Sequence, residues 1–589
     1  MIALCYGLAH HHKETEIEME LEDFPFDPRD PAWGRPGWPD WVTEFRPHQI
    51  IAMVDAVTAF EDGVNVVVVN APTGSGKTII AEGVRRLLDV RGLYVANTNS
   101  LVDQFHEDFG DYARRLKGKS NYPTRDAPEK FGAGDSWGKG ALSCGDCEKH
   151  METLPHCDKC DPYVVTEEPV LHCAHCHPVW ECPYAVAKAL ATGDKKRGIT
   201  KPPVAITNTA YFITEANMVG GLSNQEFIVI DECDTLESIL MNGIEVFISA
   251  KRMEKLGIEP PPHKTIEDEW LPWCESELIP KVRKACEEYK NKLKRAKRIS
   301  PEQTRENQSL QRLYAQVVEL ANQLRIGNAV YDGYDKGDLH FKPVRVDNVA
   351  GKKLWRHGAR WLLMSATIID PTEYVESVGI EDNGMTWELI DVPSTFPPEN
   401  RPIYVKPVAN MVWKEKETEW PKMVDGIQWA IDQHPDDRIL VHTVSYAFSK
   451  YCLERLKGTG REVMSYTMAS ERESTLARFK KSHGAVLLAS SMDRGIDLPE
   501  DDCRVVIITK MPFLSLKDKQ VTRRMYSHGG QLWYQVQTLR VLVQMTGRHV
   551  RSAQDVGTTY ILDKQFPDNV WSKGRRLLPE WWKESVRWL

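Results

Sequence analysis

The chain has 589 residues, 42% of them hydrophobic and 27% charged, which is too long for one hydrophobic core and predicts several domains. No apolar run reaches the roughly 18 residues of a membrane-spanning helix, and residues 1–10 lack the basic flank of a signal peptide, so we expect a cytoplasmic protein with no membrane partner. The net charge of −9 argues against a passive nucleic-acid coat, although a local basic groove would suffice for a nucleic-acid enzyme.

Strand and helix patterns alternate after an acidic, proline-rich N-terminal extension at residues 1–40. Residues 64–71 form a continuous β-branched run, which is typical of a buried parallel strand. A second strand pattern covers residues 93–98, and a helical pattern follows each of the two. This alternation predicts a doubly wound α/β sheet.

Two insertions interrupt this first α/β lobe, and a second α/β lobe completes the chain. The first insertion is rich in glycine, proline, cysteine and histidine, while the second carries apolar residues at helical spacing among many charges. The predicted boundaries are 41–117, 204–244 and 346–395 for the first lobe, 118–203 for the cysteine-rich insertion, 245–345 for the helical insertion and 396–589 for the second lobe.

A phosphate-binding loop is predicted where the sequence APTGSGKT follows the first strand and precedes a helix. Gly74 and Gly76 allow backbone N–H groups to approach phosphate oxygens, and the start of the helix adds a positive dipole. We expect Lys77 to reach the β- and γ-phosphates of ATP, and Thr78 to ligate Mg²⁺. The loop residues predicted to bind nucleotide are Thr73, Gly74, Ser75, Gly76, Lys77 and Thr78.

An acidic pair, Asp231 and Glu232, ends the hydrophobic strand EFIVID. At this distance after a phosphate loop, Asp231 is suited to hold Mg²⁺ and Glu232 to orient and deprotonate the attacking water. Further along, Gln544, Arg548 and Arg551 are spaced by four and three residues, which places them on one helical face. Arginines there would stabilise charge on a γ-phosphate if the second lobe closes on the first, whereas a solvated basic helix is the plainer alternative.

With these three segments in order, the chain resembles the superfamily 2 helicases, specifically the XPD/DinG group. Other stretches match in the family's order over about residues 41–570: Arg46 and Gln49 in the adenine-recognising FRPHQ, Ser365, Ala366 and Thr367 in LMSATI, and Arg494, Gly495 and Asp497 in SSMDRGIDLP. The resemblance implies two RecA-like lobes, a metal-bearing first insertion and a helical arch as the second. It also implies that Gly495 and Asp497 contribute to the nucleotide site.

Seven of the thirteen cysteines lie in the first insertion, which in a reducing compartment predicts metal binding. Four of them have zinc-ribbon spacing: Cys157, Cys160, Cys173 and Cys176. The other three resemble the last three ligands of the family's [4Fe–4S] cluster: Cys144, Cys147 and Cys182. Thr124 stands where the family has its first cluster cysteine, so the second set could hold zinc with a histidine or a cluster with an unusual fourth ligand.

The resemblance therefore implies an ATP-dependent DNA helicase that moves 5′ to 3′ on single-stranded DNA and opens forked duplexes, with ATP, Mg²⁺, Zn²⁺ and, as an open alternative, a [4Fe–4S] cluster as cofactors. Two alternatives remain in the same class: an RNA helicase, and a translocase that displaces proteins without unwinding. A third alternative is a zinc-dependent nucleic-acid-binding module in which the ATPase acts as a switch.

Overall fold

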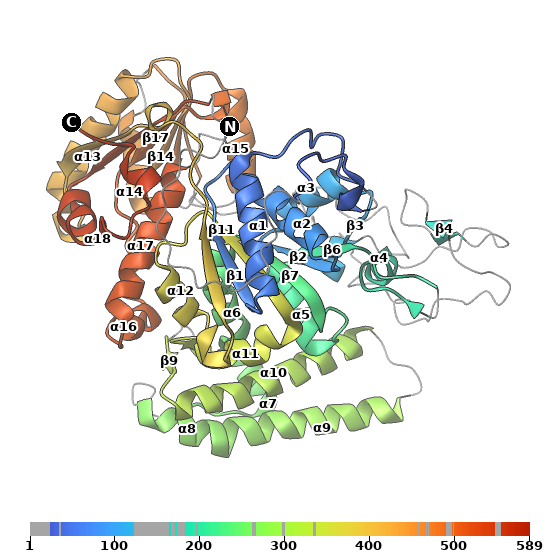
Figure 1. Ribbon diagram of the computed structural model, residues 1–589. Coiled ribbons are helices and arrows are strands. Elements are labelled where there is room, and N and C mark those ends of the chain that lie inside the picture. Colours follow the sequence, from blue (N-terminus) through green and yellow to red (C-terminus); the bar gives the residue numbers. More distant parts are fainter. Residues whose placement is uncertain are drawn as a thin grey trace.

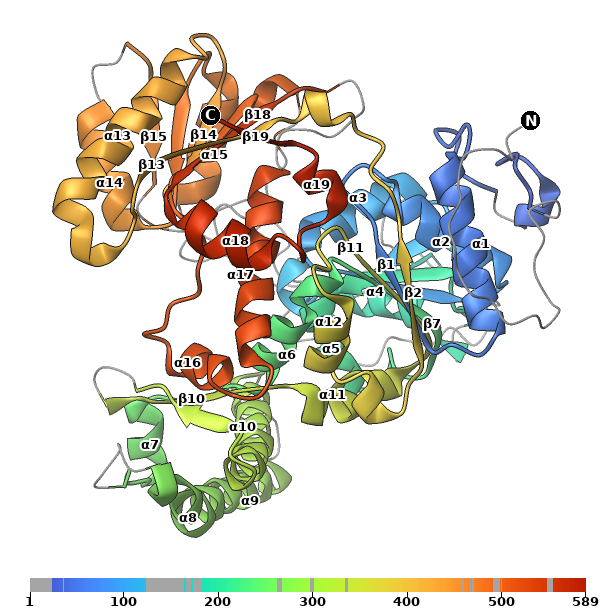
Figure 2. The same ribbon diagram turned by 60° about the vertical axis from the view of Figure 1, so that its left-hand side comes forward.

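The computed structural model describes residues 24–589 except for 35–36, 123–163, 166–170, 173–182, 196–197, 262–266, 297–300, 334–336, 457–459, 467, 469–470, 491–497, 499 and 548–554. Two α/β lobes lie side by side, and a helical insertion extends from the first lobe beneath both of them (Figure 1). Turning the molecule shows that α16 and α17 of the second lobe lie against the first lobe and the insertion (Figure 2). No described helix is long and apolar enough to cross a membrane.

The first lobe is built on a seven-stranded sheet in which every neighbouring pair of strands is parallel. Its strands, in spatial order, are β12 (Trp387–Asp391), β1 (Val66–Asn70), β11 (Gly358–Ser365), β7 (Gln225–Asp231), β2 (Gly92–Ala96), β6 (Val204–Asn208) and β3 (Ala113–Arg115). Strands from three separate parts of the chain thus share one sheet. The carboxyl ends of β1 and β7 consequently meet on the same edge.

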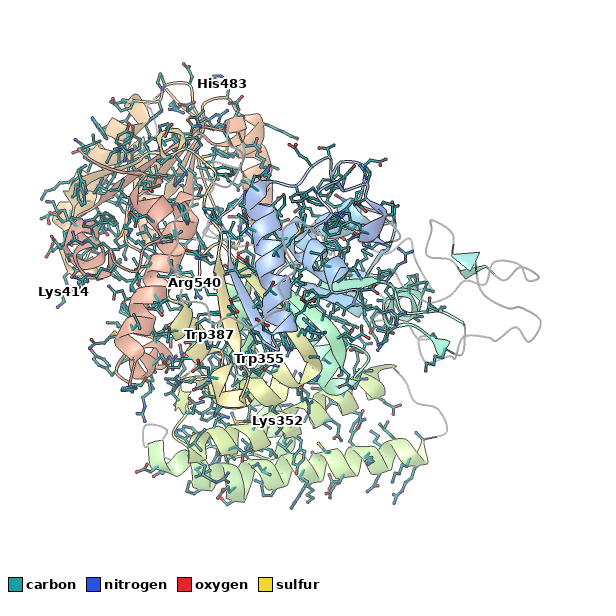
Figure 3. The ribbon with its side chains drawn as sticks, viewed as in Figure 1. Lys352, Trp355, Trp387, Lys414, His483 and Arg540 are labelled. Atoms are coloured by element: carbon teal, nitrogen blue, oxygen red, sulfur yellow. The ribbon has the colours of Figure 1, made fainter. Side chains whose placement is uncertain are left out.

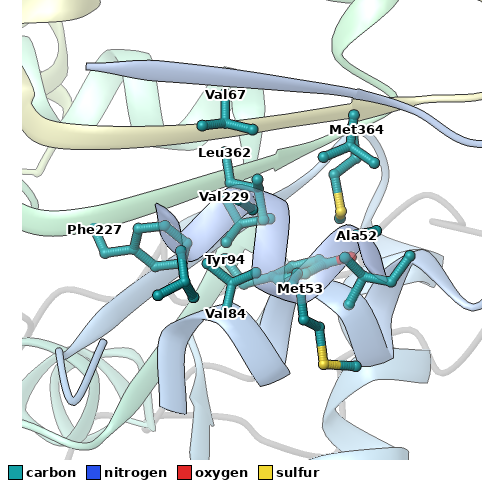
Figure 4. Packing of buried hydrophobic residues seen from close by; sticks show 14 of the residues in the cluster. Ala52, Met53, Val67, Val84, Tyr94, Phe227, Val229, Leu362 and Met364 are labelled. Atoms are coloured by element: carbon teal, nitrogen blue, oxygen red, sulfur yellow. The ribbon is translucent and has the colours of Figure 1, made fainter. Parts of the chain in front are cut away.

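Helices cover both faces of this sheet because alternate strand residues point to opposite sides. On one face, Val67 and Val69 of β1 pack with Met53 and Val84 in a buried core that Figure 4 shows from close by. Val66 and Val68 belong to the core on the other face. The helices of this lobe are α1 (Pro47–Glu61), α2 (Lys77–Leu87), α3 (Asn99–Phe109), α5 (Thr209–Met218), α6 (Leu236–Ile244), α11 (Asp347–Lys353) and α12 (Pro371–Ser377), and α4 (Pro183–Thr192) of the first insertion lies beside β3 and β6.

The second insertion contains a long helical hairpin and a three-stranded antiparallel sheet. Its elements are β8 (Val246–Ile248), α7 (Ala250–Leu256), α8 (Trp270–Trp273), α9 (Ile279–Arg295), α10 (Pro301–Arg325), β9 (Ala329–Tyr331) and β10 (Leu339–Pro343). The helices match the sequence expectation, whereas the sheet was not predicted because its strands are only three to five residues long. In the first insertion the structure describes, besides α4, a short 3-10 helix at Lys119–Asn121 and the antiparallel strands β4 (Val164–Val165) and β5 (Leu171–His172).

The second lobe repeats the plan with another seven-stranded sheet of parallel pairs. The order is β15 (Val463–Ser465), β16 (Val486–Ala489), β14 (Ile439–His442), β17 (Val505–Ile508), β18 (Thr558–Asp563), β13 (Ile403–Ala409) and β19 (Val586–Trp588). Its helices are α13 (Lys416–Asp432), α14 (Tyr446–Leu456), α15 (Arg472–Lys481), α16 (Lys519–Met525), α17 (Gly530–Thr546), α18 (Ser572–Gly574) and α19 (Glu580–Lys583). The prediction of an α/β protein with two parallel-sheet lobes is confirmed.

Candidate nucleotide site between the lobes

The predicted phosphate loop connects the end of β1 to the start of α2 at Lys77. Gly74 and Gly76 both have positive φ, 81° and 80° respectively, which is the left-handed region that glycine adopts without a steric penalty. A Cβ atom on Gly76 would lie 2.1 Å from Nε2 of Gln49, closer than any real contact. The sequence therefore needs glycine at position 76 for both backbone conformation and space.

Three side chains at the beginning of α1 hold this loop through its backbone carbonyls. Arg46 donates through Nη1 to the Gly74 carbonyl at 2.8 Å, and Gln49 donates through Nε2 to the Ser75 carbonyl at 3.0 Å. His48 donates to the same Ser75 carbonyl through Nε2 at 2.9 Å, and burial lowers the pKa of His48, which favours the neutral ring. The adenine contacts predicted for Arg46 and Gln49 stay a prediction, and the structure shows both side chains holding the loop. His48 was not predicted, although it lies between them.

Lys77, Thr78 and Asp231 converge at the carboxyl ends of β1 and β7. Tyr94 lies beside both Thr78 and Asp231, so these two side chains, predicted separately, lie close together. Burial raises the pKa of Asp231, and the nearby Lys77 ammonium counteracts part of that rise. Lys77 also donates through Nζ to the Ala71 carbonyl at 3.4 Å. Tyr94 was missed because a tyrosine inside a strand pattern indicates core.

Glu232 turns the chain out of β7 in a strained conformation. Its φ of 53° is in the left-handed region, which for a residue with a side chain costs about 1–3 kcal/mol. The turn is held because the Glu232 carbonyl accepts from the Thr235 hydroxyl at 2.8 Å and from the Thr235 backbone N–H at 3.1 Å. Asp231 also accepts from the Glu232 N–H at 3.0 Å. The turn that carries the two carboxylates is thus held at the edge of the sheet.

Gln544 from α17 of the second lobe reaches the first lobe at Asp234. Its Nε2 donates to Asp234 Oδ2 at 2.9 Å and to Thr367 Oγ1 at 3.0 Å. Asp234 Oδ1 in turn accepts from the Ser365 hydroxyl at 2.9 Å, and Arg540 donates to the Asp234 carbonyl. Figure 3 labels Arg540 where α17 faces the first lobe. Asp234 and Arg540 were not predicted; the acidic segment DECD that includes Asp234 was the only available signal.

Several predicted site residues lie outside the described part of the chain, so their positions stay predictions. These are Arg494, Gly495, Asp497, Arg548 and Arg551, and the cysteine set Cys144, Cys147, Cys157, Cys160, Cys173, Cys176 and Cys182 together with Thr124. Among the described residues, no group of three or more His, Cys, Asp or Glu side chains is arranged to hold a metal ion. That finding does not extend to the cysteine-rich insertion.

Comparisons with known proteins agree with this geometry. Residues 427–585 match the family model described as "Helicase C-terminal domain", and residues 43–136 match "Type III restriction enzyme, res subunit". The chain is 26% identical over 154 residues to a regulator of telomere elongation helicase 1 homolog from Caenorhabditis elegans, covering 23% of this chain and 15% of that protein. It is 31% identical over 124 residues to a Fanconi anemia group J protein homolog from Gallus gallus, covering 19% of this chain and 10% of that protein.

Two solved structures share the fold over nearly the whole chain. A structure titled "XPD_Helicase" has a TM-score of 0.56 at 15% identity and covers 93% of this chain and 100% of its own. The structure of S. tokodaii Xpd4 has a TM-score of 0.53 at 14% identity, with coverage of 92% and 100%. These structures show a common fold, while the sequence matches span only small parts of the curated relatives.

Proposed function

We propose that the chain, which matches the helicase C-terminal domain model and shares the fold of an XPD helicase, is a superfamily 2 helicase of the XPD-like group: an ATP-driven motor that moves along single-stranded DNA and unwinds duplexes. The observation that carries the proposal is the hydrogen bond of Gln544, in the second lobe, to Asp234, three residues after Asp231 in the first. A site with residues from both lobes changes when the lobes move apart, as a motor requires.

In the proposed site, the first lobe binds the nucleotide. We assign adenine recognition to Arg46 and Gln49, which hold the loop through the Gly74 and Ser75 carbonyls. The loop Thr73–Thr78 would surround the phosphates with backbone N–H groups, and Lys77 would add a positive charge. The Thr78 hydroxyl and the Asp231 carboxylate lie within reach of one Tyr94 hydroxyl, and such oxygen ligands fit Mg²⁺. When bound, Mg²⁺ would supply positive charge to the phosphates.

Hydrolysis requires a group that orients water and accepts its proton, and we assign that role to Glu232. Its fixed turn beside Asp231 presents the carboxylate at the end of the sheet. Gln544, Arg548 and Arg551 form the proposed contribution of the second lobe, in which the arginines would stabilise charge on the γ-phosphate. Loss of that phosphate removes the attraction between lobes, so the cleft opens and the strand advances.

The proposed DNA functions rest on similarity to proteins whose printed names describe helicases, the regulator of telomere elongation helicase 1 homolog and the structure titled "XPD_Helicase". By that similarity we propose 5′ to 3′ movement, with the cysteine-rich insertion and the helical arch parting the two strands. We further propose Zn²⁺ on Cys157, Cys160, Cys173 and Cys176, and Zn²⁺ or a [4Fe–4S] cluster on Cys144, Cys147 and Cys182.

A strand-displacement assay with forked, 5′-tailed and 3′-tailed duplexes tests the motor. We expect the wild-type chain to unwind forked and 5′-tailed DNA with ATP, and Lys77→Ala to abolish turnover while keeping most strand binding, because Lys77 contacts only phosphate in the proposal. Unwinding by Lys77→Ala would contradict the proposal. Preference for duplex RNA, or displacement of a bound protein without unwinding, would favour the rival motors, and slow hydrolysis unaffected by nucleic acid would favour a switch.

A further inference from the structure

A buried polar cluster joins the two lobes one helix away from the proposed ATP site. It comprises Glu237 on α6, Glu373 and Ser377 on α12, Arg524 on α16, and Trp533 and Gln537 on α17. Glu237 is 6% exposed, Glu373 is 7% exposed and Arg524 is 2% exposed. Charged residues are seldom buried this deeply unless they are paired.

Glu237 receives most of its contacts from the second lobe. Its Oε2 accepts from Trp533 Nε1 at 3.0 Å and from Gln537 Nε2 at 3.3 Å. Arg524 also approaches this carboxylate, with 3.7 Å between Nη2 and Oε1, and its guanidinium lies over the Trp533 ring. These contacts therefore bind α6, the helix that follows the turn of Asp231 and Glu232, to α16 and α17.

Arg524 and Glu237 lie close together, but no hydrogen bond joins their side chains. Nη2 of Arg524 donates to the Ser377 hydroxyl at 3.0 Å, while Nε and Nη1 have no hydrogen-bond partner in the described part of the chain. Glu237 Oε1 has none there either. The gap of 3.7 Å exceeds a charge-assisted hydrogen bond by only about 1 Å. A small approach of the lobes would therefore complete a strong buried hydrogen bond.

The cluster and the ATP site share one face of α17. Trp533, Gln537, Arg540 and Gln544 are spaced by four, three and four residues, which brings them to the same side of the helix. The first two contact Glu237, and the last two contact Asp234. Glu237 and Asp234 flank the start of α6, directly after Asp231 and Glu232. A rotation or shift of α17 must therefore move the acidic turn as well.

We propose that Glu237 and Arg524 are positioning residues for ATP hydrolysis: their buried pair joins α6 to α16, which contacts α17 through Arg524 and Trp533, and so holds the turn of Asp231 and Glu232 in its reactive position. Neither side chain contacts the proposed phosphate loop, so the pair acts on the reaction step and not on nucleotide binding. This inference rests on the proposed ATPase function.

The test compares Glu237→Gln, Arg524→Gln, the double variant and Arg524→Lys with the wild-type chain. Each is measured for single-turnover ATP hydrolysis with single-stranded DNA, for the Kd of a non-hydrolysable ATP analogue and for Tm. We expect both single neutral variants to lose about tenfold or more in hydrolysis, as a misplaced catalytic group does, with the analogue Kd changed by less than about threefold. The double variant should regain part of the loss because no unpaired charge stays buried, and Arg524→Lys should regain part of it because the charge is kept.

Arg252→Gln is the matched control, since Arg252 pairs with Glu306 at 2.9 Å within the second insertion, away from the lobe boundary, and the variant should hydrolyse ATP like the wild type. Wild-type hydrolysis rates in the single variants, or equal losses in hydrolysis and nucleotide affinity, would overturn the inference. Should the wild-type chain itself not hydrolyse ATP, the proposed function fails, while the Tm values of the single and double variants still test the pair. Additive changes in Tm would then overturn it.

Discussion

The two sides of the proposed nucleotide site are built in different ways. The phosphate loop lies within one strand–loop–helix unit, and its neighbours Arg46 and Gln49 come from fewer than 30 residues away. The facing side joins Gln544 to Thr367 across 177 positions and to Asp234 across 310 positions. The loop side therefore depends on local chain geometry, while the facing side exists only when the lobes are correctly docked.

The two sides also differ in how their polar groups are satisfied. The loop is held by side chains that donate to backbone carbonyls, and these bonds need no movement to form. The lobe boundary relies on buried charges, including the incomplete pair of Arg524 and Glu237. A complete set of hydrogen bonds makes a rigid element, whereas a pair left open by about 1 Å is suited to an interface that moves.

Gly76→Ala should cause the largest loss of ATP hydrolysis, because it distorts the phosphate loop. The new Cβ would collide with Gln49 and force a side chain into a left-handed conformation, so we expect ATP hydrolysis to fall about 100-fold or more, with loss of nucleotide affinity. Gly63→Ala is the control, since Gly63 has φ of 87° but nothing within 4 Å of an added Cβ. Nucleotide titrations and steady-state kinetics measure both. Normal nucleotide affinity in Gly76→Ala would mean that the loop is not the phosphate site.

Gln544→Ala tests the contribution of the second lobe to the proposed nucleotide site, and it should lower kcat by less than Gly76→Ala lowers hydrolysis. It removes the bonds to Asp234 and Thr367 but leaves the phosphate loop unchanged, so we expect a loss of roughly 10- to 100-fold in kcat with little change in nucleotide affinity. The exposed Gln531 on the same helix provides the control Gln531→Ala. A Gln544→Ala variant that loses nucleotide affinity instead of kcat would contradict the assignment of nucleotide binding to the phosphate loop and of the reaction step to Gln544.

This division also explains what could be predicted from the sequence. The alternation of strands and helices predicted both parallel sheets, and the motif APTGSGKT predicted a loop whose glycines have the required positive φ. Sequence spacing gave no means of pairing Glu237 with Trp533, since the two are 296 positions apart and meet only through lobe docking. Tyr94 and His48 were missed for another reason: each has a residue type and position that fit an ordinary core.

Glu373→Gln should give the smallest effect on the reaction and a clear effect on the pH dependence of stability. Burial, together with the neighbouring Glu237 carboxylate, raises the pKa of Glu373 from 4.5 to about 7, against the opposing effects of Ser377, Arg524 and Arg540. The folded chain therefore keeps a proton that the unfolded chain loses. Its stabilising effect is full below about pH 4.5 and is lost as the pH rises through 7, by roughly 3 kcal/mol at most.

Replacing the carboxyl with an amide removes that titration while keeping similar size and polarity. We therefore expect the Tm difference between Glu373→Gln and the wild type to grow in favour of the variant between pH 5 and pH 8, as roughly follows from the shifted pKa. Glu376→Gln is the control on the same helix, since Glu376 pairs with Arg345 and its side chain is 53% exposed. Parallel Tm curves for Glu373→Gln and the wild type would show that the carboxyl is already ionised in the folded state. In that case the boundary would hold two buried carboxylates against Arg524, and the incomplete pair would be under stronger attraction than the geometry alone indicates.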